Sequence, residues 1–294
     1  MTFPTKPTKK RLVYLDHAAT TPTDPAVVKA MAPFWTKSFA NPSALYSLGR
    51  ANHGAVESAR ARIAEVLFTQ PDCLTFTSGG TEANNLAIFG IIKSVISVKP
   101  KIHVITTAIE HHSILGPIKE LEKHGVAVTY LPVNERGEIS VKKLLAALRP
   151  ETALVSVMYA NNEIGTINPI AEIGRELLKY RKHNKTQWPF FHTDACQAAG
   201  SLDLHVERLH VDAMTINGSK IYGPKGVGAL FVRRGVAVKP IMFGGGQENS
   251  LRSGTENVPA IIGFAKALEL AQKNSDKEAV RQAKLRDYFW NQIH

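Results

Sequence analysis

Short apolar segments alternate with longer amphipathic segments along almost the whole chain, and this alternation limits the fold more than any other feature of the sequence. The short apolar segments predict strands at residues 13–15, 74–77, 101–106, 127–132, 153–158, 190–194, 213–216 and 227–232. The amphipathic segments predict helices at residues 25–38, 47–68, 82–97, 114–124, 141–148, 170–182, 258–275 and 277–293. Strands that alternate with helices form a mostly parallel sheet covered on both faces, so the sequence predicts an α/β fold.

The composition is that of an ordinary globular protein, with 44% hydrophobic and 21% charged residues in 294 positions. This length allows one large domain and part of a second. No apolar run approaches the length of a transmembrane span. The basic residues 1–11 resemble a disordered lead-in without the apolar core of a signal peptide. We therefore expect no membrane contact and a cytoplasmic location.

The formal charge of +11 raises the question of a nucleic-acid partner. The Lys and Arg residues are scattered, however, and the sequence has no recognition helix, zinc finger or aromatic RNA-binding signature. We expect no direct nucleic-acid binding and interpret the charge as a solvated face that attracts acidic partners.

The two cysteines, Cys73 and Cys196, are far apart and match no disulfide or zinc spacing. A low cysteine count is typical of a reducing cytosol. Because a buried cysteine usually behaves as a small inert apolar side chain, we expect neither thiol to be reactive.

A lysine in a loop of Gly, Ser and Pro lies between two of the predicted strands, at Lys220 within residues 217–226. Lysine is seldom buried, and a desolvated lysine loses its proton more easily and becomes a nucleophile. The alternative is a surface hairpin with solvated lysines.

Asp194 ends the predicted strand at residues 190–194, upstream of this lysine. Enzymes that use pyridoxal phosphate (PLP) need such a pair, a lysine that carries the cofactor and an acid that keeps its pyridine nitrogen protonated. Asp194 is alternatively a helix N-cap, and both interpretations can hold. Residues at strand ends of one α/β sheet face the same crevice.

A third motif is typical of an anion site. Ser78-Gly79-Gly80-Thr81 joins a predicted strand to a predicted helix, so free N–H groups and the helix dipole point at one place. A plain glycine turn is the alternative.

The adjacent histidines His111 and His112 suggest a metal site only weakly, because neighbouring side chains in an extended chain point in opposite directions. The sequence His192-Thr193-Asp194 is an equally weak metal pattern. We expect no metal site.

With these motifs in place, the chain resembles the cysteine desulfurases of the NifS/IscS type, in the class V aminotransferase group of PLP enzymes. The matching motifs occur in family order over nearly the whole chain: Tyr-Leu-Asp-His-Ala-Ala-Thr-Thr-Pro at 14–22, Thr-Ser-Gly-Gly-Thr-Glu-Ala-Asn-Asn at 77–85, Glu-His-His at 110–112, Asn-Asn-Glu-Ile-Gly at 161–165, Asp-Ala-Cys-Gln at 194–197, Lys-Ile-Tyr-Gly-Pro-Lys-Gly at 220–226, Gly-Gly-Gly-Gln-Glu at 244–248 and Arg-Ser-Gly-Thr-Glu-Asn-Val-Pro at 252–259.

The resemblance implies a PLP-dependent transferase of fold type I, with a seven-stranded type of sheet and the cofactor pyridoxal 5'-phosphate. It implies catalytic roles for Lys220, which carries the cofactor and moves protons, and for His111, which stacks on the ring and helps to move protons. It implies that Asp194 pairs with the pyridine nitrogen, Gln197 with the ring hydroxyl oxygen, and Asn161 with the substrate. The phosphate ligands that it implies are Gly80, Thr81, Asn217, Ser219 and, from a partner subunit, Thr255.

The chain departs from the family in two places. Asn217 and Ser219 stand where the family has the Ser and His of Ser-x-His-Lys. No cysteine follows Cys196, although the family's nucleophilic cysteine lies well after the Arg-Ser-Gly-Thr motif. We therefore expect a chain truncated at the C-terminus, with residues 1–20 associated with the small domain, residues 21–257 as the large PLP-binding domain, and residues 258–294 as the start of an incomplete small C-terminal domain.

The resemblance implies a cysteine desulfurase that converts L-cysteine to L-alanine and passes sulfur on as a persulfide for iron–sulfur cluster or thio-cofactor assembly. It also implies a homodimer and a scaffold or other protein that accepts the sulfur. The alternatives are another class V enzyme, such as a selenocysteine lyase or an aminotransferase, and a non-catalytic assembly subunit with the PLP fold. Without the family's cysteine, we expect these 294 residues to bind PLP but not to release sulfide at a useful rate.

Overall fold

The computed structural model describes residues 12–293, and within them one sheet of seven strands runs in the order β1-β7-β6-β5-β4-β2-β3. The strands are β1 (Leu74–Thr77), β2 (His103–Thr107), β3 (Ala127–Leu131), β4 (Thr152–Ser156), β5 (Phe190–Asp194), β6 (Ala213–Asn217) and β7 (Gly228–Val232). The five strands from β3 to β6 in the sheet order are parallel, and β7 runs antiparallel to both of its neighbours. The predicted mostly parallel α/β sheet is confirmed.

The helices of the described residues are α1 (Pro25–Met31), α2 (Pro33–Thr36), α3 (Ser47–Leu67), α4 (Gly80–Val95), α5 (His112–Lys123), α6 (Val141–Ala147), α7 (Ile170–Asn184), α8 (Val206–Leu209) and α9 (Val258–Ile293). The single helix predicted at 25–38 is wrong, because Pro33 has no N–H to continue α1 and starts α2 instead. The predicted break after residue 275 is also wrong, since α9 is continuous. The strand predicted at 13–15 is absent from the described residues, and the lead-in predicted at 1–11 lies outside them.

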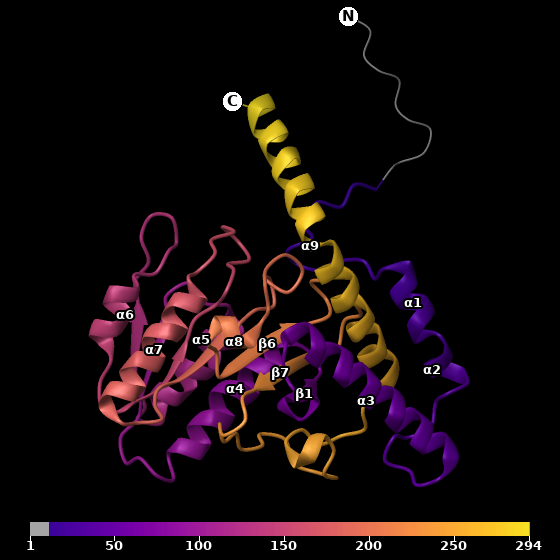
Figure 1. The fold of residues 1–294 in the computed structure, drawn as a ribbon, viewed down its shortest axis with the longest axis horizontal. Helices are drawn as coiled ribbons and strands as arrows, with labels where there is room; N and C mark the ends of the chain where they lie inside the picture. The colour runs from indigo at the N-terminus through magenta and orange to yellow at the C-terminus, as the bar shows by residue number, and fades with distance from the viewer. Residues whose placement is uncertain (1–11, 294) are drawn as a thin grey trace, which may run out of the picture.

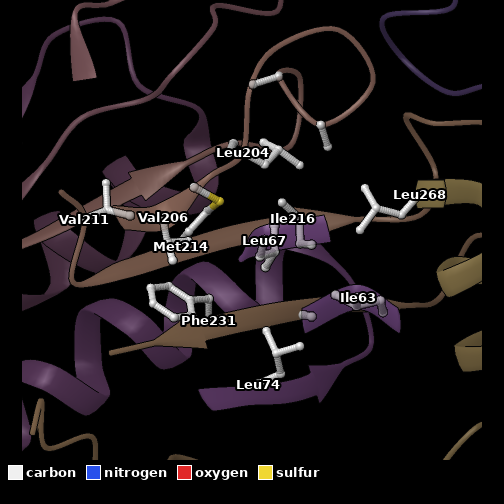
Figure 2. Packing of buried hydrophobic residues seen from close by; sticks show 14 of the residues in the cluster. Ile63, Leu67, Leu74, Leu204, Val206, Val211, Met214, Ile216, Phe231 and Leu268 are labelled. Carbon is white, nitrogen blue, oxygen red and sulfur yellow. The ribbon is translucent and has the colours of Figure 1, made fainter. Parts of the chain in front are cut away.

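Side chains that alternate along each strand build one apolar layer on each face of the sheet. Phe190 of β5 faces a layer made with α4 and α5, whereas Phe191 faces a layer made mainly with α3, α7, α8 and α9. Figure 2 shows part of the second layer, in which Ile63 and Leu67 of α3 lie with Phe231 of β7. Because both faces are buried, the strand ends are the parts of the sheet left free to carry polar groups.

The two halves of α9 have different surroundings. Its first half is buried against α1 and α3, with Phe264 and Leu268 fully buried. Its second half projects away from the body of the molecule (Figure 1) and exposes apolar side chains such as Phe289, which is 63% exposed. Within residues 12–293, no helix is both long enough and apolar enough to cross a membrane.

A segment from the N-terminal part of the chain lies on the loop that follows β6. The N–H of Thr21 donates to the Ser219 carbonyl at 2.9 Å, and the N–H of Asp24 donates to the Tyr222 carbonyl at 2.9 Å. Residues about 200 positions apart therefore meet at the carboxyl end of β6, beside the carboxyl end of β5 and the start of α4.

Candidate active site

A cavity of about 780 Å³ opens where the carboxyl ends of β5 and β6 meet the N-terminus of α4. Eight of the residues predicted from the sequence line it, namely Gly80, Thr81, His111, Asp194, Gln197, Asn217, Ser219 and Lys220. Two predicted residues, Asn161 and Thr255, are not among the residues that line it. The sheet therefore brings most of the predicted set to one place, as its parallel strand ends require.

Asp194 is the last residue of β5 and is only 7% exposed. Its Oδ2 accepts a hydrogen bond from Asn84 Nδ2 at 2.7 Å, and its Oδ1 accepts one from the Cys196 N–H at 3.0 Å. Two donors, one to each oxygen, fix the orientation of the carboxylate. The cavity therefore has a fixed, mostly buried acid at its base.

Lys220 is half-buried, so the prediction of a buried lysine is wrong. Its Nζ donates to the carbonyls of Ala18 and Ala19, at 2.7 and 2.6 Å. Gln197 Nε2 donates to the same Ala18 carbonyl at 2.9 Å. The amine thus lies at the mouth of the cavity, where two carbonyls of the N-terminal segment bind it. It is not desolvated by an apolar core, as the sequence had suggested.

The turn before α4 is shaped to bind an anion. Gly79 has φ of 150°, which a residue with a side chain rarely adopts, and α4 begins at the next residue. A Cβ on Gly80 would lie 2.7 Å from Cys196 Sγ, so only glycine leaves this space free. The first N–H groups of a helix have no partner within the helix, and here they face the cavity.

Neighbouring side chains complete this turn. Glu82 Oε2 accepts from the Ser78 N–H at 2.8 Å, and Glu82 Oε1 accepts from Arg252 Nε at 2.8 Å. Burial by itself would raise the pKa of Glu82, but these hydrogen bonds outweigh it and hold the pKa below its ordinary value. Asn217 lies across from Gly80, and its Oδ1 is buried without a partner among the described residues.

The donor set of the cavity fits pyridoxal phosphate. A glycine-lined helix N-terminus suits the phosphate, a buried carboxylate suits the pyridinium nitrogen, and a lysine at the mouth suits the carbonyl carbon. The buried oxygen of Asn217 has no partner among the described residues, and the cavity of about 780 Å³ leaves room for a bound group.

Asn161 and Thr255 lie elsewhere. The Asn161 side chain closes the turn after β4, because its Oδ1 accepts from the N–H groups of Glu163 and Ile164 and its Nδ2 donates to the Ile109 carbonyl. The neighbouring Asn162 and Glu163 line the cavity instead. Thr255 lines an adjacent hollow that shares Ser78 with the main cavity.

Three polar residues near the cavity were missed in the sequence. Asn84 Nδ2 donates to Ser113 Oγ at 2.8 Å, and Ser113 Oγ lies 2.7 Å from His111 Nδ1. Glu110 is buried, and burial raises its pKa to about 8, with hydrogen bonds from Met158 and Thr107 opposing the shift. Asn84 lies inside a helix and Glu110 beside the more conspicuous His111, so only the position of both within matched motifs could have singled them out.

The two cysteines are buried, as expected. Cys196 lines the cavity, and burial first, then the charge of Asp194, raises the pKa of its thiol well above the ordinary value. Cys73 is 8% exposed and precedes the edge strand β1. Burial and the charge of Asp194 both disfavour the thiolate of Cys196.

In residues 12–293, no group of three His, Cys, Asp or Glu side chains is arranged to hold a metal ion. His192 lies inside the sheet, where its ring nitrogens contact Ser156 Oγ at 2.9 Å and Thr215 Oγ1 at 3.1 Å. Burial lowers its pKa to about 4. His192 is therefore a neutral core residue with its polar atoms satisfied.

Comparison with known proteins identifies the same family as the sequence motifs. Residues 13–294 match the family model described as aminotransferase class-V. A cysteine desulfurase IscS from Dictyoglomus turgidum is 48% identical over 284 residues, which are 97% of this chain and 70% of that protein. A cysteine desulfurase IscS from Clostridium botulinum is 47% identical over 274 residues, or 93% of this chain and 67% of that one.

Two solved structures have the same fold. A NifS-like protein superposes with a TM-score of 0.90 at 37% identity, covering 96% of this chain and 75% of its own. A structure of SspA in complex with cysteine superposes with a TM-score of 0.82 at 38% identity, covering 92% of this chain and 77% of its own.

Proposed function

This chain belongs to the aminotransferase class-V family and, within it, to the PLP-dependent cysteine desulfurases, and we propose that the cavity beside Lys220 and Asp194 is where it acts on L-cysteine. The observation that carries the proposal is the meeting of these two residues with the Gly80 turn in one cavity. The bound cysteine of the SspA structure supports the choice of substrate.

Each residue of the cavity has a chemical task in this proposal. The cofactor, once bound, supplies an electron sink that stabilises negative charge at the substrate Cα. Lys220 carries the cofactor and takes or returns the Cα proton at its Nζ, while Asp194 holds the proton of the pyridine nitrogen. Gln197 binds the ring oxygen. Gly80, Thr81, Asn217 and Ser219 would hold the phosphate, with Asn217 and Ser219 in place of the family's Ser and His.

The sulfur leaves cysteine when its C–S bond breaks and a thiolate takes the sulfur as a persulfide, with L-alanine as the other product. Neither Cys73 nor Cys196 is suited to be that thiolate, because each is buried and the pKa of Cys196 is raised. We assign the transfer to another thiol, which passes the sulfur toward iron–sulfur or thio-cofactor assembly in the cytoplasm through a scaffold or other acceptor.

The wider organisation follows the family. Residues 21–257 form the large PLP-binding domain, and residues 258–293 belong to a small domain with which residues 12–20 associate; residues 1–11, also assigned to it from the sequence, lie outside the described residues. The protein is a homodimer in which Thr255 reaches the partner's phosphate site. Exposed apolar side chains support the dimer, among them Trp35, Phe39 and Phe243 at 62%, 70% and 78% exposure. Light scattering that shows a monomer with a shielded PLP phosphate contradicts it.

Exchange of the Cα proton tests the proposed function without requiring sulfur transfer. The 294-residue chain with PLP is incubated with L-alanine or L-cysteine in deuterated water, and loss of the Cα proton signal is followed by NMR. We expect exchange in the wild type and in Lys225→Ala, the matched lysine of the same cavity, and none in Lys220→Ala. Exchange that survives Lys220→Ala contradicts the assignment.

A sulfide assay separates the two chemical steps. Sulfide production by the 294-residue chain that disappears in Cys73→Ala or Cys196→Ala would identify an unexpected nucleophile and overturn the assignment to another thiol.

A further inference from the structure

We propose that Asn84 and Ser113 are positioning residues that hold the His111 ring in its neutral form with the proton on Nε2. Asn84 is fully buried in α4, and Ser113 lies in the first turn of α5, directly after His111. The tautomer is a property of the chain itself, and only the use of the Nε2 proton rests on the proposed function.

The orientation of the Asn84 amide follows from Asp194. A carboxylate can only accept, so the atom of Asn84 at 2.7 Å from Asp194 Oδ2 is the donor Nδ2. The same Nδ2 lies 2.8 Å from Ser113 Oγ, and its two hydrogens serve the two acceptors. Because both hydrogens of Nδ2 are used in this orientation, Asn84 Oδ1 is left without a partner among the described residues.

The direction of the next hydrogen bond follows from Ser113. Because Ser113 Oγ accepts from Asn84, its one hydrogen is free to donate to His111 Nδ1 at 2.7 Å. The backbone N–H of Ser113 donates to the same Nδ1 at 3.1 Å. An N–H can only donate, so Nδ1 carries no proton and the proton of the neutral ring is on Nε2.

This arrangement limits what His111 can do in the cavity that it lines. A charged ring would need a proton on Nδ1, where two donors already point. The neutral His111 ring therefore offers a hydrogen bond from Nε2 to an acceptor in the cavity and has no free nitrogen that could accept one. Transfer of the Cα proton then falls to Lys220 alone, which narrows the role that the family resemblance gave to the histidine.

The test is the long-range ¹H–¹⁵N spectrum of the 294-residue chain labelled with ¹⁵N-histidine, recorded with and without PLP and assigned with His111→Gln. We expect an Nε2–H to Nδ1–H ratio of about 10:1 or more in the wild type, since both hydrogen bonds favour it. Ser113→Ala and Asn84→Ala should lower this ratio severalfold, and Ser113→Thr, which keeps the hydroxyl, should restore it.

A wild-type spectrum in which Nδ1–H is as abundant as Nε2–H or more so overturns the proposal, and so does a ratio that is the same in Ser113→Ala and Asn84→Ala as in the wild type. If either variant fails to fold, the wild-type spectrum still decides. Failure of Cα proton exchange would refute the proposed function but leave this spectrum unchanged, so the two failures are distinguishable.

Discussion

The floor and the rim of the cavity are held in different ways. What we call the floor is a group of four polar side chains, each at most 7% exposed, of which all but Glu110 line the cavity: Asn84, Glu110, Ser113 and Asp194. The rim consists of residues 16–21 and the three side chains that donate to their carbonyls, Gln197, Lys220 and Lys225. Side-chain hydrogen bonds between neighbouring elements fix the floor, whereas backbone carbonyls from the other end of the chain hold the rim.

The floor holds side chains whose orientation must stay fixed, whereas the rim makes contacts with the Lys220 amine that must be able to change. The floor sets the orientation of Asp194 and His111, and a buried hydrogen-bonded network is costly to disturb. The rim holds the Lys220 amine by two carbonyls, and a cofactor bonded to that amine would compete with both contacts. We therefore expect substitutions in the floor to change stability strongly and substitutions in the rim to change it weakly.

The largest expected effect is the pH dependence that Glu110 gives to the floor. Its pKa is raised by burial to about 8, so between about pH 4.5 and 8 the folded chain binds more protons than the unfolded chain. Stability therefore falls as the pH rises through this window, by on the order of 4 kcal/mol at about 1.4 kcal/mol per pKa unit. Glu110→Gln should remove this fall.

The measurement is the free energy of unfolding from urea titrations between pH 5 and 8. Glu65→Gln, at an exposed helix position, is the matched control and should leave the slope unchanged. Identical pH slopes in the wild type and Glu110→Gln would show that Glu110 is not a neutral buried acid.

The second effect concerns Asp194. Asp194→Ala leaves one hydrogen of Asn84 Nδ2 and the Cys196 N–H without an acceptor, and we expect it to reduce the free energy of unfolding by about 3 kcal/mol. Asp194→Asn keeps one acceptor oxygen and should lose less. Chemical denaturation at pH 7 checks the order, and equal losses in both variants would argue against a fixed carboxylate.

A smaller effect is expected at the rim. Thr21 Oγ1 donates to the Ser219 carbonyl at 3.0 Å and accepts from the Tyr222 N–H at 2.8 Å. Thr21→Val should cost about 1–2 kcal/mol and speed hydrogen exchange at Tyr222. Thr23→Val is the control, because it loses only one hydrogen bond of 3.4 Å, to the Gly223 carbonyl. It should change the free energy of unfolding and the hydrogen exchange at Tyr222 less than Thr21→Val does. The reverse order would contradict the account of the rim.

The smallest effect should come from His17, whose ring lies between those of Tyr14 and Tyr222, with centroid distances of 5.1 and 5.8 Å. These rings are exposed, so His17→Ala should cost about 0.5 kcal/mol in a thermal or urea melt. A loss as large as that of Asp194→Ala would mean that the rim is as firmly held as the floor.

The sequence predicted the residues that end strands or form glycine turns, because these have local signals. Asp194, Lys220 and Gly80 are of this kind, and all three line the cavity. Asn84 was not predicted, because an asparagine inside a helix has no local feature that distinguishes it. The half-buried state of Lys220 could not be predicted either, since it depends on carbonyls about 200 residues away.

The same reasoning explains the errors in the fold. The mostly parallel sheet followed from the alternation of segments, but the break at Pro33 and the continuity of α9 depend on single residues at helix ends. The turn closed by Asn161 is set by contacts with Ile109 and Ile164, which no spacing in the sequence reveals.

The most direct test of the account is the identity of the lysine that carries PLP. The chain is loaded with PLP, reduced with borohydride and mapped by peptide mass spectrometry, with Lys220→Ala and Lys225→Ala in parallel. The account predicts the label on Lys220 in the wild type and in Lys225→Ala, and no label in Lys220→Ala. A label on Lys225, the other lysine of the cavity, or on any other lysine, would contradict it.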